Sequence, residues 1–232
     1  MLTRKQGEAL AEQYRTNGLV RIAGFLSDAE AAELHAMLRG RDDWRRLFNS
    51  DDKVFEMDRS TQASLDADRR ASLDEAVYAG ARSEFQYRYE TIRVPDDEEE
   101  RLGSADPLAK LALQLSGGET RDLFHRVTGA TRIRFADAQA TAFSPGDFLT
   151  GHDDDFAGKE RLAAYVLSLT PTWRIEWGGL LIMHGEGDQP SQAFPPAMNV
   201  MTLFRVPQMH SVSEVSRAAA YRRYSITGWL RG

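Results

Sequence analysis

The second half of the chain is a series of short apolar segments separated by turn residues, and this pattern constrains the fold more than any other feature. The turns are marked by Ser144-Pro145-Gly146, Trp177-Gly178-Gly179 and Pro195-Pro196. Short antiparallel strands of this kind pack as two sheets, so the pattern predicts a double-stranded β-helix, or jelly roll. We expect its strands near 131–143, 161–170, 179–184, 199–206, 209–215 and 221–230.

The first half carries helical signals. Thr3-x-x-Gln6 and Ser27-x-x-Glu30 have the form of capping boxes, and Asn17-Gly18 and Gly40 end the helices that follow them. Between these helices, Leu19-Val20-Arg21-Ile22 predicts a short strand. Further helices are expected over 66–80 and 107–128, the second interrupted at Gly117-Gly118, with 41–65 irregular and the acidic run 96–100 a solvated loop.

The predicted fold class is therefore α+β with a mainly β core, in which helices of the N-terminal half pack on one sheet of the jelly roll. A chain of 232 residues is long enough for one sizeable core. We expect one domain over 1–232, in which 1–130 forms helix-rich support and substrate-side loops and 131–232 forms the jelly-roll core.

Composition excludes several kinds of site. The chain has no cysteine, so any bound metal must have nitrogen and oxygen ligands. The formal charge of −6 argues against a general nucleic-acid-binding surface. No apolar run approaches the roughly 20 residues of a membrane span, and the amino terminus leads into a polar helix, so we expect a cytoplasmic protein with no membrane partner.

The segment His152-Asp153-Asp154 is the leading metal-ligand candidate. In an extended segment, residues two apart project to the same side, which favours His152 with Asp154 and turns Asp153 away. A third ligand should be another histidine, since two imidazoles and one carboxylate hold divalent iron on one face and leave the other positions open. His210 is preferred because of the residues that follow it, and His184 is its competitor.

Arg223 supplies what a bare metal site lacks, namely an anchor for a carboxylate. The segments 208–215 and 221–230 predict a hairpin folded about Ala218, which places Arg223 opposite Ser213, roughly 10 Å along the strand from His210. A five-carbon keto diacid that chelates the metal could span this gap, and the planar guanidinium could bind both oxygens of its remote carboxylate. Ser225 lies two residues on and shares the same face.

A strand with one aromatic face is predicted over 84–94, where Phe85, Tyr87 and Tyr89 alternate with polar residues. Sheet packing is the commoner role of such a face, but it could also receive an extended peptide. We therefore take Tyr87, Tyr89, Arg88 and Trp173 as candidate substrate residues.

Together, these segments resemble the 2-oxoglutarate/Fe(II)-dependent oxygenase superfamily, and within it the prolyl-hydroxylase branch. The resemblance runs from about Thr131 to the C-terminus. The segments that carry it are Gly151-His152-Asp153-Asp154, Leu167-Ser168-Leu169-Thr170, Trp177-Gly178-Gly179, Pro196-x-x-Asn199, His210-Ser211-Val212 and Arg223-Tyr224-Ser225-Ile226-Thr227-Gly228-Trp229.

The resemblance implies iron ligands at His152, Asp154 and His210, and a 2-oxoglutarate anchor at Arg223 with Ser225 beside it. It implies no further catalytic residue beyond the metal centre. The chain departs from several prolyl hydroxylases at two positions near the cosubstrate, because Ser168 and Phe143 stand where those proteins carry tyrosines.

The resemblance also implies an activity. With Fe(II), 2-oxoglutarate and O₂, and with ascorbate as a supporting reductant, such an enzyme hydroxylates an unactivated C–H bond and releases succinate and CO₂. A prolyl residue of a protein or peptide is the first expectation for the substrate. The alternatives are a free amino acid or other small metabolite, and a non-catalytic jelly-roll module that binds a metal. The sequence leaves open the oligomeric state and whether 41–65 and 95–105 act as lids.

Overall fold

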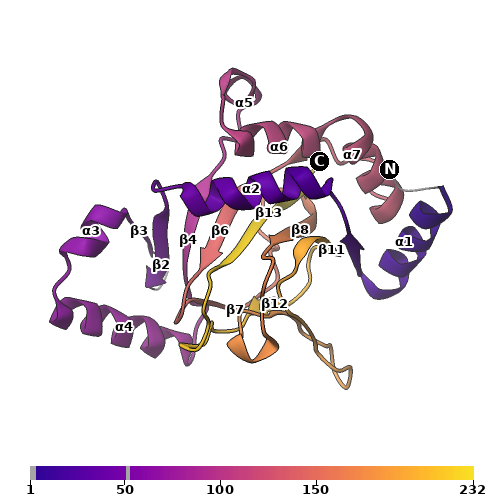
Figure 1. Ribbon diagram of the computed structural model, residues 1–232. Helices are drawn as coiled ribbons and strands as arrows, with labels where there is room; N and C mark the ends of the chain where they lie inside the picture. The colour runs from indigo at the N-terminus through magenta and orange to yellow at the C-terminus, as the bar shows by residue number, and fades with distance from the viewer. Residues whose placement is uncertain (1–3, 51–52) are drawn as a thin grey trace.

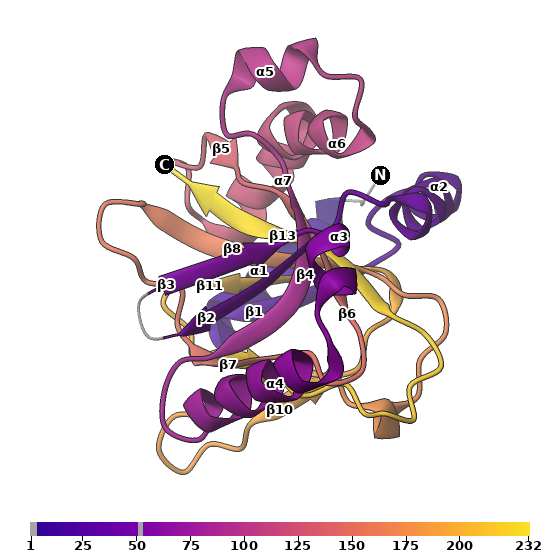
Figure 2. The same cartoon turned by 90° about the vertical axis from the view of Figure 1, so that its left-hand side faces the viewer.

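The computed structural model describes residues 4–50 and 53–232, and in this part of the chain the strands form a curled antiparallel sheet with helices around it. Figures 1 and 2 show the sheet from two directions. The helices are α1 (Arg4–Asn17), α2 (Asp28–Gly40), α3 (Arg59–Ser64), α4 (Ala67–Ala81), α5 (Glu98–Gly103), α6 (Pro107–Ser116) and α7 (Gly118–Thr128), with a short 3₁₀ helix at Ile175–Trp177.

The strands confirm the predicted jelly roll. They are β1 (Leu19–Ala23), β2 (Arg45–Ser50), β3 (Lys53–Met57), β4 (Tyr87–Arg93), β5 (Phe135–Ala136), β6 (Gln139–Phe143), β7 (Phe148–His152), β8 (Arg161–Leu169), β9 (Leu181–Met183), β10 (Gln192–Phe194), β11 (Met198–Arg205), β12 (His210–Val212) and β13 (Arg223–Arg231). The hydrogen-bonded order is β1-β11-β8-β13-β6-β4-β7-β12-β9-β10. Because β4 pairs with both β6 and β7, the sheet curls there and brings β7 and β12 to face β8 and β13.

Alternation along β8 and β13 separates the helix-packed core from the interior of the jelly roll. Tyr165 and Leu167 of β8, and Tyr224 and Ile226 of β13, are buried in one hydrophobic cluster with residues of α2, α6 and α7. Successive residues of a strand point to opposite faces of the sheet. Arg223 and every second residue after it in β13 therefore point to the interior of the jelly roll. The predicted packing of N-terminal helices on one sheet is thus confirmed.

The helices α3 and α4 do not join that layer. Val77 of α4 packs instead against Phe48 of β2 and Phe148 of β7, in a separate cluster. Figure 2 shows α4 running beside β7, at the opposite end of the molecule from α5 and α6.

Local signals account for several helix ends. Ser27 and Glu30 form both hydrogen bonds of the predicted capping box at the start of α2. The predicted interruption at Gly117-Gly118 separates α6 from α7. The helix α1 ends at Asn17, as predicted, whereas Thr3 of the first capping box lies outside the described residues.

Three predictions were wrong. The segment 41–65 is not irregular, because it contains the β2–β3 hairpin and α3, and β2 is secured by pairing with β4. Part of the acidic run is helical, since Asp97 caps α5 and Glu98–Glu100 form its first turn, where carboxylates interact favourably with the helix dipole. The hairpin of 208–215 with 221–230 does not exist: β12 pairs with β7 and β9, and β13 with β5, β6 and β8.

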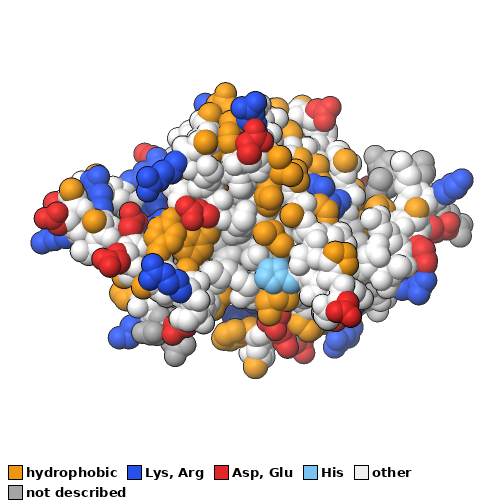
Figure 3. All heavy atoms as spheres, turned by 90° about the horizontal axis from the view of Figure 1, so that it is seen from below, with side chains coloured by type: hydrophobic (Ala, Val, Ile, Leu, Met, Phe, Trp, Pro, Cys, Tyr) orange, Lys and Arg blue, Asp and Glu red, His pale blue; other side chains and the backbone are white. Residues whose placement is uncertain are grey.

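The surface mixes charges of both signs. Figure 3 shows Lys and Arg side chains interspersed with Asp and Glu side chains on the face seen from below, in keeping with the 29 basic and 35 acidic residues of the chain. Among residues 4–50 and 53–232, no helix combines the length and the apolar character needed to cross a membrane.

Candidate metal centre

Pairing of β7 with β12 brings His152 and His210 together. The two residues are direct partners in the register of these strands, although 58 positions separate them in the sequence. Their rings lie 4.1 Å apart between centroids. The sequence therefore supplied the two imidazoles, and antiparallel pairing supplies their proximity.

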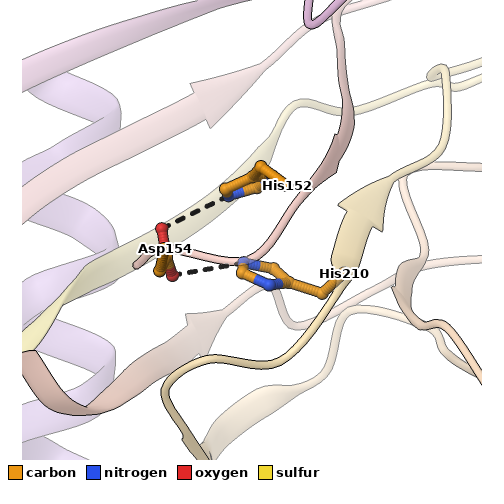
Figure 4. Close-up of side chains that lie close together, drawn as sticks. All are labelled: His152, Asp154 and His210. Atoms are coloured by element: carbon orange, nitrogen blue, oxygen red, sulfur yellow. Dashed lines mark ion pairs between the residues drawn. The ribbon is translucent and has the colours of Figure 1, made fainter. Parts of the chain in front are cut away.

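Asp154 completes a cluster of one carboxylate and two imidazoles (Figure 4). Its Oδ1 atom lies 3.5 Å from Nε2 of His152, and its Oδ2 atom lies 3.4 Å from Nε2 of His210. One ligand atom from each side chain lies within 4.8 Å of the other two. Nitrogen and oxygen donors in this set suit divalent iron.

Both imidazoles are oriented by the backbone. Nδ1 of His152 lies 3.1 Å from the Thr150 carbonyl oxygen, and Nδ1 of His210 lies 2.7 Å from the Gln208 carbonyl oxygen. If each Nδ1–H donates to its carbonyl, the lone pair of each Nε2 is left free to bind a metal. The cluster thus carries the backbone support that metal-ligating histidines have in proteins.

Asp154 reaches this position by a different route from the one predicted. The strand β7 ends at His152, and Asp154 lies beyond it with a φ of 64°, in the left-handed region. The extended conformation expected for 152–154 is therefore wrong. Aspartate adopts this conformation more often than most non-glycine residues, at a cost of roughly 1 kcal/mol.

Burial keeps His210 neutral. Desolvation, reinforced by the neighbouring His152, lowers the pKa of His210 to about 4. At neutral pH the imidazole is consequently in the unprotonated form that binds metals.

This pKa makes the stability of the metal-free protein depend on pH. Between about pH 6.5 and about pH 4, the unfolded chain protonates His210 and the folded chain does not, so the free energy of unfolding falls as the pH is lowered across this range. The expected loss is about 3 kcal/mol. Urea unfolding of the metal-free wild type and of His210→Leu should show it, because the variant should lose less stability over the same range; equal slopes would contradict the assignment.

Arg223 is a buried cation with no acid beside it. Its side chain is 3% exposed, its Nε has no partner within the described residues, and burial lowers its pKa to about 10. The guanidinium lies 4.9 Å from the ring centroid of Phe143, its register partner on β6. Ser225 is fully buried, and its Oγ also lacks a partner.

These orphaned groups test whether an anion fits the site. A buried unpaired guanidinium is costly, and a carboxylate would satisfy both it and the Ser225 hydroxyl. The residues present therefore fit a dicarboxylate cosubstrate whose other end reaches the metal. Arg223 and His210 line one cavity although they do not belong to one hairpin.

The cavity has a volume of about 670 Å³ and contains the metal cluster. Among the candidate residues, Phe143, Tyr87 and Tyr89 line it as well. Tyr89 stacks on Phe143 with ring centroids 5.1 Å apart, and burial raises its pKa to about 12, so its phenol stays protonated at neutral pH.

Four other candidates, namely Ser225, Arg88, Trp173 and Ser168, lie outside the cavity lining. Arg88 points away to Asp74, to the Gly146 carbonyl and toward Asp147. Trp173 donates to the Gly178 carbonyl, and its ring lies beside Gly179, as does Cδ of Arg223. The Ser168 hydroxyl accepts a hydrogen bond from the Ala197 amide. Their predicted contacts with substrate or cosubstrate stay predictions.

Several lining residues were not among the candidates named from the sequence, although Phe85 belongs to the predicted aromatic face. Phe85 packs against His152, with centroids 5.4 Å apart, and Phe204 packs against His210 at 4.7 Å. Thr227 and Trp229 could have been found, because they continue the every-second-residue pattern that begins at Arg223. Arg161 carries no such signal.

The comparisons with known proteins agree with this geometry. Residues 138–231 match the model of the 2OG-Fe(II) oxygenase superfamily. A prolyl 3-hydroxylase of Drosophila melanogaster, sudestada1, is 31% identical over 133 residues, which is 52% of this chain and 24% of that protein. The chain spans about a quarter of the length of the curated relatives it matches.

Solved structures share the fold over nearly the whole chain. A Pseudomonas putida prolyl-4-hydroxylase superposes with a TM-score of 0.64 at 19% identity, covering 97% of this chain and 98% of the other. A Trichoplax adhaerens prolyl hydroxylase, solved with a peptide of the hypoxia-inducible factor oxygen degradation domain, gives a TM-score of 0.59 at 18% identity, covering 98% and 91%. Residues 138–231 of the chain thus resemble the 2OG-Fe(II) oxygenase superfamily, and the chain is similar to prolyl hydroxylases.

Proposed function

We propose that this chain is an Fe(II)- and 2-oxoglutarate-dependent dioxygenase that hydroxylates a prolyl residue of a protein or peptide. The observation that carries the proposal is the unpaired, buried Arg223 in the same cavity as the cluster of His152, Asp154 and His210. A metal-binding module without a cosubstrate would have no use for such a guanidinium. A keto diacid would bind the metal through its keto-acid end and Arg223 through its remote carboxylate.

Each residue then has a defined task. His152, Asp154 and His210 would hold Fe(II) through two Nε2 atoms and one carboxylate oxygen. Arg223 and Ser225 would bind the remote carboxylate of 2-oxoglutarate, and Phe143 would pack against its carbon chain. Bound iron with 2-oxoglutarate and O₂ supplies the oxidising power that converts a C–H bond to a hydroxyl group while 2-oxoglutarate becomes succinate and CO₂. The buried aromatic side chains limit the access of water to the cavity.

A polypeptide substrate is favoured by the mouth of the cavity. Val54, Phe85 and Phe156 line it, and their side chains are 54%, 47% and 64% exposed. Exposed apolar side chains around a cavity are typical of surfaces that bind another molecule. The similarity to prolyl hydroxylases, one of them solved with a peptide, favours the same substrate class.

The test is a comparison of two substrate classes in one assay. The protein is incubated with Fe(II), 2-oxoglutarate and ascorbate, together with either short proline-containing peptides blocked at both ends or free L-proline. We expect peptides to stimulate 2-oxoglutarate consumption and to gain the mass of one oxygen atom on proline.

The other outcomes have distinct meanings. Oxygen incorporated only into free proline or another small metabolite would favour the small-molecule alternative. A protein that binds Fe(II) but consumes no 2-oxoglutarate, even without a substrate, would point to the non-catalytic module. Hydroxylation of a residue other than proline would retain the enzyme class and overturn the prolyl assignment.

A further inference from the structure

Asp154 lies beyond the end of β7, so strand pairing does not hold its backbone in place. It lies two residues beyond His152, the last residue of β7 and the register partner of His210, and it has a φ of 64°. The following residues, 155–160, form an exposed loop that leads to β8. A left-handed backbone at a non-glycine residue costs roughly 1 kcal/mol, so a contact must hold the main chain for the carboxylate to face the imidazoles.

Arg161 provides that contact. Its Nη1 donates a hydrogen bond of 3.0 Å to the main-chain carbonyl of Asp154. The direction of this carbonyl and that of the Asp154 side chain depend on the same backbone torsions, so fixing one restricts the other.

Trp229 holds Arg161 in turn. The carbon at the centre of the guanidinium lies 3.6 Å from the centroid of the Trp229 ring, which is close enough for a strong cation–π contact. Trp229 belongs to β13, which pairs with β8, and it lies two residues before Arg231, the register partner of Arg161. The buried Arg161 Nε has no hydrogen-bond partner in the part of the chain that the structure describes, so no second hydrogen bond there draws the side chain elsewhere.

We propose that Arg161, stacked on Trp229, is a positioning residue that holds Asp154 in its metal-binding conformation. The inference rests on the proposed function, because it assumes that Asp154 binds the metal. By this inference, a residue of β8 and a residue of β13 together fix the orientation of Asp154, which follows β7. Metal affinity should consequently depend on a residue that touches no ligand atom.

The experiment measures Mn²⁺ binding, as a substitute for Fe(II), by electron paramagnetic resonance without any turnover. Replacing Arg161 by methionine keeps an apolar stem against Trp229 and removes the donor. The Mn²⁺ dissociation constant should rise about 10- to 100-fold, the range found when a residue that supports a metal ligand is lost. Arg161→Lys restores a donor and a cation, so its dissociation constant should lie between those of the wild type and Arg161→Met.

Arg174→Met is the matched control, because Arg174 is two-thirds exposed and its ion pair is with Glu176 on the surface. It should bind Mn²⁺ like the wild type. The visible spectrum of the Co²⁺-loaded protein gives a second measurement, since it reports coordination geometry and should change in Arg161→Met alone. In the metal-free protein, amide hydrogen exchange over 153–160 should be faster in Arg161→Met than in the control.

The outcomes separate this inference from the proposed function. Wild-type affinity, an unchanged Co²⁺ spectrum and unchanged exchange in Arg161→Met would overturn the inference and leave the enzyme assignment intact. A wild-type chain that binds no Mn²⁺ would overturn the proposed function and the inference with it. Equal weakening in Arg161→Met and Arg174→Met would show a nonspecific effect and overturn the positioning role.

Discussion

Replacing Asp154 by alanine should reduce 2-oxoglutarate consumption by at least about 100-fold. Loss of a residue that only supports a metal ligand costs about 10- to 100-fold in metal affinity or activity, so loss of a ligand itself should cost more. Asp154 is also the only carboxylate in the cluster with His152 and His210 among the described residues. Its removal would leave two neutral imidazoles to hold a divalent cation.

The measurement is uncoupled 2-oxoglutarate turnover without substrate, together with Mn²⁺ affinity. Asp122→Ala is the matched control, because Asp122 is an exposed aspartate on α7, outside the cavity lining. Circular dichroism should show the same fold for both variants. Undiminished turnover in Asp154→Ala would remove Asp154 from the ligand set and with it the proposed iron site.

Replacing Arg223 by methionine should weaken 2-oxoglutarate binding about 100-fold. A forked guanidinium makes two charge-assisted hydrogen bonds to a carboxylate, and their loss corresponds to about 3 kcal/mol in binding free energy. Calorimetry with the Mn²⁺-loaded protein measures this affinity directly. Arg223→Lys keeps the charge but not the planar fork, so it should recover only part of the loss.

The same substitution should act on stability with the opposite sign. In the protein without cosubstrate, Arg223 is a buried cation whose pKa is lowered to about 10 by burial alone. Methionine removes the desolvation cost, and the free energy of unfolding of the cosubstrate-free protein should rise by about 1–3 kcal/mol. Arg217→Met, at an exposed position, should change neither quantity. Lower stability together with unchanged 2-oxoglutarate affinity would make Arg223 a structural residue.

Local physical signals explain which elements could be predicted. The capping box at Ser27 and Glu30 and the glycine pair at Gly117-Gly118 act on their own neighbours, so the ends of α2, α6 and α7 follow from a few adjacent residues. The β2–β3 hairpin escaped prediction because β3 is mostly exposed and its apolar residues, Val54, Phe55 and Met57, do not alternate strictly with polar ones. The hairpin is held in place because β2 pairs with β4, and no pattern in the neighbouring residues predicts that pairing.

The predicted hairpin of 208–215 with 221–230 was wrong because strands that are neighbours in the sequence need not pair with each other. β12 and β13 follow one another in the chain, yet each pairs with strands far away in the sequence. In a jelly roll, successive strands cross between the facing sheets, so neighbours in the chain need not be neighbours in a sheet. His210 and Arg223 meet in one cavity for this reason.

The sequence by itself determined the chemistry of the centre: a chain without cysteine that offers His152, Asp154, His210 and Arg223 can bind iron only through nitrogen and oxygen and can anchor a diacid. The tertiary structure alone decided which histidines meet, how Asp154 turns toward them, and that Arg161 holds it there. The reason is that the donor properties of a side chain are intrinsic to its residue. Its position depends instead on strand pairing between segments that are distant in the sequence.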